Sequence, residues 1–258
     1  MDNIQEDKIL SDFLTSLGVW RDAVVIGGGY ALIIYKIYLA SKKSNINPVG
    51  TRDIDSLVPR KIPKKSAYSI SQHLEMNGFS RVFKDRNHPA TESYLKELNG
   101  IEIEVEFLTD RRARRDKDEN ISISGVVAQP LRYIEMSLDS PYEFYTIDGT
   151  KGWVVSPAAW VFHKGLTFEK RKSRSKSQKD LYGIWYALSQ LAELSELALE
   201  EFYALKQKHP SWFAKMKQSL NRWMHEASPV DWEQLELQDP SGALTRLRFV
   251  RVLRKVLD

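Results

Sequence analysis

The chain of 258 residues contains no cysteine. This absence excludes a disulfide framework, thiol nucleophiles and metal sites built from thiolates, and it is consistent with a reducing compartment. Long apolar runs are also lacking, because the longest one, from Tyr30 to Ala40, contains Lys36. It is far too short to span a bilayer. We therefore expect a soluble, cytoplasmic protein with no membrane partner.

Two further patterns are missing. The acidic segment at residues 1–7 lacks the basic-then-apolar layout of a signal peptide. No Ser-His-Asp set or nucleophile elbow is visible, and no second histidine stands near His163. Hydrolase chemistry of the triad type and a zinc site therefore have little support.

The chain has enough apolar residues, 42% in all, to bury one large core or two modest ones. Alternating and helical patterns are mixed up to residue 155, whereas only helical periodicity follows Ser156-Pro157. We therefore expect an α/β domain over 1–155 and a helical domain over 156–258. Expected strands cover 23–26, 53–58, 80–84, 93–98, 101–108, 121–128, 142–147 and 153–155. Expected helices cover 9–17, 30–41, 66–76, 158–171, 179–191, 195–208, 211–227 and 242–257.

A pair of aspartates, Asp53 and Asp55, lies in one of these expected strands. Residues two apart in a strand face the same way, about 6.5 Å apart. Two like charges in a half-buried strand are costly unless a cation compensates them, and a divalent metal does so well. The alternative interpretation is a solvated strand edge. We predict that Asp53 and Asp55 bind metal.

A glycine run, Gly27-Gly28-Gly29, follows the apolar residues Val24, Val25 and Ile26 and precedes a predicted helix. Free backbone N–H groups at such a turn can receive a phosphate. Three glycines can also serve only to let a helix pack closely on a sheet. The Walker lysine and the spaced glycines of dinucleotide folds are absent.

A third acid is expected from the alternating segment 101–108, which places Glu102, Glu104 and Glu106 on one face. An amphipathic strand with a wet acidic face is the alternative, above all for Glu102 and Glu104. Glu106 comes before the apolar pair Phe107-Leu108 and is our candidate for the third carboxylate. Glu104 is the second choice.

Positive charge is clustered although the net charge is only +4. Such clusters can attract polyanions such as NTP or RNA, or they can be solvated surfaces. The three clusters lie at 111–115, 164–179 and 246–255. Within the second, Lys164 can either extend along an apolar helix surface or reach a triphosphate. The last helical segment, with its leucines and valines beside a basic face, can dock a partner helix or RNA, or belong to the core.

Taken together, these residues resemble the DNA polymerase beta-type nucleotidyltransferase superfamily, and in particular its bacterial branch with the AbiEii-type and related toxin-antitoxin nucleotidyltransferases. Short matching pieces occur in the family's order over roughly residues 20–190. They are Gly28-Gly29-Tyr30-Ala31, Thr51-x-Asp53-x-Asp55, Val105 to Leu108, Pro157 to Lys164, Arg171 and Lys179-Asp180-Leu181.

The resemblance implies an α+β fold, with a small mixed sheet flanked by helices and then a C-terminal helical bundle. It implies Mg²⁺, or Mn²⁺ in its place, held by Asp53 and Asp55, with Glu106 sharing a second ion and helping to deprotonate an attacking hydroxyl. Nucleotide-binding roles are implied for Gly28, Gly29, Tyr30, Thr51, Lys164 and Asp180. Asp180 would pair with Arg171 or Lys164.

The implied activity is transfer of a nucleoside monophosphate from an NTP to an acceptor hydroxyl of RNA or tRNA, a protein or a small molecule. A toxin-like role with a small antitoxin partner is included. Two departures stand out: Gly29-Tyr30 offers no serine hydroxyl to the phosphates, and the third acid is a glutamate where aspartate is common. They support the alternative of a catalytically weak nucleotide- or RNA-binding module.

Overall fold

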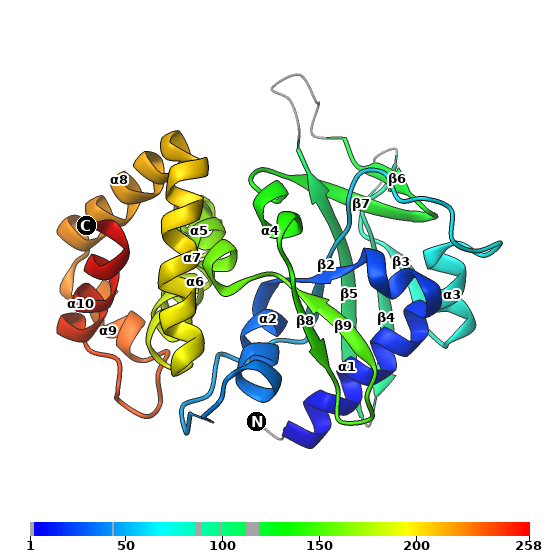
Figure 1. Cartoon of the computed structure of the whole chain (residues 1–258), viewed down its shortest axis with the longest axis horizontal. Helices are drawn as coiled ribbons and strands as arrows, with labels where there is room; N and C mark the ends of the chain where they lie inside the picture. Colours follow the sequence, from blue (N-terminus) through cyan, green and yellow to red (C-terminus); the bar gives the residue numbers. More distant parts are fainter. Residues whose placement is uncertain (1–2, 43, 86–88, 99, 112–118) are drawn as a thin grey trace. The chain divides into compact units, whose positions relative to one another are not determined.

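The computed structural model describes residues 3–42, 44–85, 89–98, 100–111 and 119–258. The chain forms two compact units (Figure 1). The sheet unit comprises Met1–Ile34 and Gly50–Val155, and the helical unit comprises Tyr35–Val49 and Ser156–Asp258. The expected fold class, a mixed sheet with helices and then C-terminal helices, is confirmed.

The strands of the described residues form one mixed sheet. They are β1 (Val25–Ile26), β2 (Asp53–Leu57), β3 (Ser80–Phe83), β4 (Glu92–Leu98), β5 (Ile101–Asp110), β6 (Ile121–Ile123), β7 (Val126–Leu131), β8 (Tyr142–Tyr145) and β9 (Lys151–Val154). Their order is β3-β4-β5-β2-β1-β9-β8, and β7 pairs with the later part of β5 and with β6. The β1–β9, β2–β5 and β5–β7 pairs are parallel, and the other pairs are antiparallel.

Strand β5, which pairs with β2, β4 and β7, has two different faces. Ile103, Val105 and Phe107 are fully or almost fully buried on one face. The glutamates between them, Glu104 and Glu106, are half-exposed on the other face. A strand with this pattern buries one row of side chains and leaves the other row in contact with solvent.

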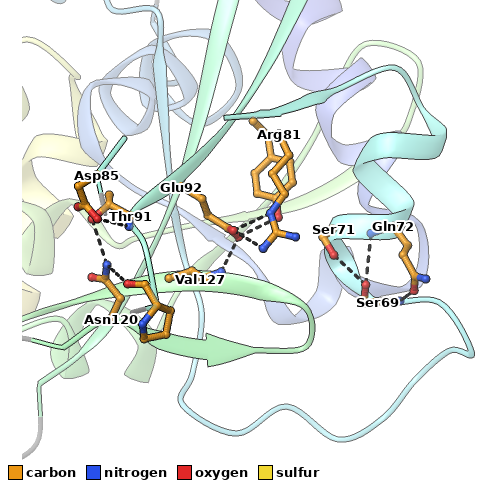
Figure 2. A network of polar contacts seen from close by, with 11 residues as sticks. Ser69, Ser71, Gln72, Arg81, Asp85, Thr91, Glu92, Asn120 and Val127 are labelled. Carbon is orange, nitrogen blue, oxygen red and sulfur yellow. Dashed lines mark hydrogen bonds and ion pairs between the residues drawn. The ribbon is translucent and has the colours of Figure 1, made fainter. Parts of the chain in front are cut away.

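The helices of the sheet unit are α1 (Asn3–Leu17), η1 (Gly18–Ala23), α2 (Gly28–Ile34), α3 (Ile70–Met76) and α4 (Glu135–Asp139). Helix α1 buries Ile9, Leu10, Phe13, Leu14 and Leu17, a spacing that forms one helical face. Helix α3 begins with a capping box, in which the Ser69 hydroxyl accepts from Gln72 N and the Gln72 side chain accepts from Ser69 N (Figure 2).

Apart from one helical turn at 35–39, the helices of the other unit begin at Pro157 or later. They are α5 (Pro157–Thr167), η3 (Phe168–Lys170), α6 (Arg174–Ser189), α7 (Glu193–Lys208), α8 (Pro210–Glu226), α9 (Pro229–Glu236) and α10 (Arg246–Leu257), with the π-helical turn η2 (Tyr35–Leu39). Ser156 caps α5 by accepting from Ala159 N at 3.3 Å. A Cβ on Gly165 would lie 2.6 Å from Met216 Cγ, so this glycine lets α5 and α8 pack closely.

The segment 35–49 belongs to the helical unit, although it lies far from the unit's other residues in sequence. The Tyr182 hydroxyl donates to the carbonyl of Asn47 at 2.7 Å, and the Tyr186 hydroxyl donates to that of Ile46 at 3.2 Å. Within the described residues, no helix has the length and apolar character that a membrane span requires.

A buried carboxylate links three strands of the sheet unit. Glu92 on β4 is 1% exposed and accepts hydrogen bonds from Arg81 on β3, from the Tyr94 hydroxyl at 2.8 Å and from Val127 N on β7 at 2.6 Å (Figure 2). Burial and the Glu92 charge raise the pKa of Tyr94, so its hydroxyl stays protonated and can donate. Buried charge is tolerated when several donors satisfy it in this way.

Replacing this carboxylate should destabilise the sheet unit. In Glu92→Ala, Tyr94 and Val127 N lose a buried acceptor, and we expect the free energy of unfolding to fall by about 3 kcal/mol. Glu97→Ala on the exposed side of the same strand should change it by less than about 0.5 kcal/mol. Urea unfolding followed by circular dichroism measures both, and a Glu92→Ala protein as stable as Glu97→Ala would contradict the assignment.

Candidate functional site

The two aspartates lie on β2, as the sequence pattern predicts. Asp53 is exposed and Asp55 half-exposed, whereas Ile54 and Ser56 between and after them are buried. The hydroxyl of Thr51 accepts a hydrogen bond from Asp53 N at 3.2 Å and so fixes the backbone at the start of the strand. Both carboxylates therefore belong to the solvent-facing side of β2.

The neighbouring strand β5 adds two more carboxylates to this surface. In the parallel β2–β5 pairing, Asp53 is the register partner of Glu104 and Asp55 the partner of Glu106. Register partners on adjacent strands point to the same face of a sheet. Four carboxylates thus share one face, and we call Asp53, Asp55, Glu104 and Glu106 the acidic face.

Part of this negative charge is compensated by Lys84, which follows β3. Its ammonium pairs with Glu104 at 2.5 Å and also with Glu106. Partial burial lowers the pKa of Lys84, but the hydrogen bonds to both glutamates outweigh burial and raise it above its usual value. For Glu104, burial raises the pKa, but the hydrogen bonds to Lys84 and Ser93 and the charge of Lys84 outweigh burial. The pKa of Glu104 therefore lies below its usual value. These shifts keep both Lys84 and Glu104 charged at neutral pH.

The glycine turn lies directly against Asp55. Gly27 N donates to Asp55 O at 2.8 Å. Gly28 has a φ of +55°, and a Cβ there would lie 1.7 Å from Asp55 Oδ2. A Cβ on Gly29 would lie 2.8 Å from Thr51 Cγ2. The structure therefore brings Gly28, Gly29, Thr51 and Asp55 together, and neither Gly28 nor Gly29 can carry a side chain without displacing these neighbours.

Tyr30 differs from the other residues that were expected to bind nucleotide. Its side chain is fully buried, and burial together with the charge of Glu6 raises its pKa. The ring is therefore part of the core of the sheet unit. Because the side chain is buried, only the backbone of Tyr30 could contact a nucleotide.

Lys164 and Asp180 lie in the helical unit, where they form the expected pair. Lys164 Nζ is 2.8 Å from Asp180 Oδ1, and Arg171 Nε donates to Asp180 Oδ2 at 2.6 Å. Burial raises the pKa of Asp180, but the charges of Lys164 and Arg171 and their hydrogen bonds outweigh it and lower the pKa. Asp180 thus holds both cations in place.

The acidic face fits a divalent cation by the chemistry of its donors, since carboxylate oxygens are the ligands that Mg²⁺ prefers. Asp53 and Asp55 face the same way beside the glycine turn. Among the described residues, however, no group of three Asp, Glu or His side chains is placed to hold one ion. Glu106 is paired with Lys84 instead, so its role as third ligand stays a prediction.

Sequence reasoning missed Lys84. It placed Lys84 as the last residue of the expected strand 80–84 but did not give the register that brings this lysine across β4 to two glutamates of β5. Of the first basic cluster, Arg112, Arg114 and Arg115 lie outside the described residues.

Comparisons with known proteins give a matching family model and similar solved structures. A family model described as "Nucleotidyltransferase" matches residues 8–207. A search of curated proteins found no match. Two solved structures are similar at 15% identity each. An antigenic nucleotidyltransferase-like protein from Paracoccidioides brasiliensis has a TM-score of 0.44, over 83% of this chain and 93% of that chain. The antibiotic-resistance factor ANT(2'')-Ia has a TM-score of 0.40, over 82% and 100%.

The contact between Gly28 and Asp55 leads to a stability prediction with a matched control. Gly28 and Gly149 both have positive φ, so alanine at either position costs about 1–2 kcal/mol of backbone strain. Only at Gly28 does the new methyl group collide with a neighbour, because nothing lies within 4 Å of a Cβ at Gly149. Gly28→Ala should therefore lower the free energy of unfolding by at least about 1 kcal/mol more than Gly149→Ala. Equal losses in urea unfolding would contradict the contact.

Proposed function

The chain belongs to the nucleotidyltransferase family, and we propose that it transfers a nucleoside monophosphate from an NTP to an acceptor hydroxyl. The observation that carries this proposal is the placement of the Gly28 turn directly against Asp55, on the acidic face of β2 and β5. Transfer of a phosphate group requires the phosphate to lie next to the carboxylates that bind its neutralising cation. The hydroxyl oxygen attacks the α-phosphorus, the bond from that phosphorus to the bridging oxygen of the β-phosphate breaks, and pyrophosphate leaves.

In this proposal Asp53 and Asp55 hold Mg²⁺, with Mn²⁺ able to replace it. The ion would supply electrostatic stabilisation of the phosphate oxygens. Thr51 fixes the backbone of Asp53 through its hydroxyl. The backbone around Gly28, Gly29 and Tyr30, where α2 begins, would orient the phosphates, because no side chain blocks their approach at the two glycines.

Glu106 is proposed to take the proton of the attacking hydroxyl. It can do so only after Lys84 releases it, since the two are paired in the structure. In the helical unit, Lys164 is proposed to neutralise phosphate charge. Asp180 and Arg171 would keep its side chain ordered, as their ion pairs indicate.

The acceptor is proposed to be RNA or tRNA, a protein or a small molecule, and the setting the cytoplasm. A toxin-like role, with a small antitoxin protein as partner, follows from the resemblance to the AbiEii-type branch. A second candidate function is a catalytically weak nucleotide- or RNA-binding module. It is favoured by the pairing of Glu106 with Lys84 and by the lack of a three-carboxylate group among the described residues.

A transfer assay tests the activity. The protein is incubated with Mg²⁺, each α-labelled NTP and total RNA or cell extract. Label transfer should fall at least about 100-fold in Asp53→Asn and in Asp55→Asn, because each loses a charge from the acidic face. Glu102→Gln, on the exposed part of β5, should retain activity. Transfer that survives in both aspartate variants would refute the assignment, and tight NTP binding without any transfer would favour the binding module.

Lys84 offers a test that does not depend on turnover. In Lys84→Gln the acidic face loses its compensating ammonium, so it should attract a divalent cation more strongly. We expect the Kd for Mn²⁺, measured by electron paramagnetic resonance, to fall about three- to tenfold. Lys96→Gln removes the partner of Asp12 elsewhere in the sheet unit and should leave this Kd unchanged. An unchanged Kd in Lys84→Gln would mean that Mn²⁺ does not bind beside Glu104 and Glu106.

A further inference from the structure

Helix α10, outside the proposed site, carries five cations within the ten residues from Arg246 to Lys255. Its buried face consists of Phe249, Val252, Leu253, Val256 and Leu257. The exposed face holds Arg246, Arg248, Arg251, Arg254 and Lys255. No acidic residue lies between Arg246 and Leu257, so nothing within the helix neutralises this face. We call these five residues the α10 basic face.

The helix is held rigidly in its unit. Phe249 packs against Trp223 and Trp232, with ring centroids 5.7 and 5.8 Å apart. At the other end of α10, Lys217 of α8 donates to the carbonyl of Leu257. The basic face is therefore presented by an ordered helix, which reduces the entropy that a binding event would cost.

Intramolecular contacts account for only two of the five cations. Arg246 lies over the Trp232 ring, 5.0 Å from its centroid, and Arg248 donates to the carbonyl of Ala243 at 2.8 Å. Arg251, Arg254 and Lys255 have neither an ion pair nor a side-chain hydrogen bond to any residue that the structure describes. These three are available to an external anion.

Helix stability does not explain the charge pattern either. Cations near a helix C-terminus are favourable, and this accounts for Arg254 and Lys255. Arg246 and Arg248, however, occupy the first turn of α10, where the positive end of the helix dipole disfavours a cation. The second basic cluster behaves differently, because there Arg171 and Lys164 pair with Asp180, and Arg174 pairs with Asp231.

We propose that the α10 basic face binds the phosphate backbone of RNA. The stripe from Arg248 to Lys255 is about 10 Å long, long enough to contact more than one phosphate of a strand. Four of the five cations are arginines, whose planar guanidinium group binds phosphate through two parallel hydrogen bonds. If the proposed function holds, the bound RNA is the acceptor of the transferred nucleotide. The binding itself does not depend on that function.

An anionic membrane is a less suitable partner. A helix that lies on a bilayer needs an exposed apolar face to insert between the lipids. The apolar face of α10 is buried in its own unit, and of the large apolar side chains on the helix only Leu247 is markedly exposed, at 69%. The exposed surface therefore offers charge without an apolar anchor.

Fluorescence anisotropy tests the proposal with a fluorescein-labelled RNA hairpin that has a single-stranded 3′ end, in the absence of NTP. In the full chain, Arg251→Ala/Arg254→Ala/Lys255→Ala should weaken binding at least tenfold and reduce the slope of log K against log salt by about 2. A matched control, Lys172→Ala/Lys176→Ala/Lys179→Ala, removes the same charge from exposed lysines of the second basic cluster. It should weaken binding less than threefold. Arg251→Lys/Arg254→Lys keeps the charge and should keep the salt slope.

Equal losses in the two triple variants would overturn the proposal, since they would reflect net charge alone. Failure of the wild-type protein to bind the hairpin would also overturn it. Equal affinity of the wild-type protein for a DNA hairpin of the same sequence would contradict the assignment to RNA. A triple variant of α10 that no longer binds phosphatidylserine vesicles but still binds the RNA hairpin would contradict it as well. RNA binding that persists when no transfer activity is found would refute the proposed function and leave this inference standing.

Discussion

The contact between Asp55 and the backbone of Gly28 is the constraint on which the proposed site depends. A carboxylate can approach a main chain this closely only where no Cβ stands in the way. The same approach places the glycine turn beside β2, whose register with β5 aligns Asp55 with Glu106 and Asp53 with Glu104. The absence of a side chain at Gly28 thus allows the glycine turn, which can receive phosphate, to lie beside the acidic face, which can bind a cation.

The acidic face also shows how the fold manages like charges on one surface. Lys84 compensates Glu104 and Glu106, whereas Asp53 remains exposed to solvent. Lys84 follows the edge strand β3, and its side chain is 36% exposed. The helical unit uses the opposite arrangement, in which one buried aspartate, Asp180, holds two cations.

Much of this arrangement could be predicted from period-two alternation, because that pattern states which side chains share a face before any pairing is known. It identified the strands that carry Asp53, Asp55 and Glu106. The position of Lys84 depends on the register of β3, β4 and β5, which alternation does not determine. The predicted ends of helices and strands were wrong where a helix cap or a tight turn determines them. Helix α3 begins at Ile70 because Ser69 caps it, and the expected strand at 121–128 is a hairpin that turns at Ser124-Gly125, both with positive φ.

The central claim is that Asp53 and Asp55 hold a cation beside phosphates received at the glycine turn. The most direct measurement is a crystal structure of the protein grown with Mn²⁺ and a non-hydrolysable NTP analogue, with the ion located by its anomalous scattering. The account predicts an Mn²⁺ peak bound to the carboxylates of Asp53 and Asp55, with the phosphates against Gly28 and Gly29. An ion and nucleotide bound elsewhere, with Asp53 and Asp55 making no contact to either, would contradict it.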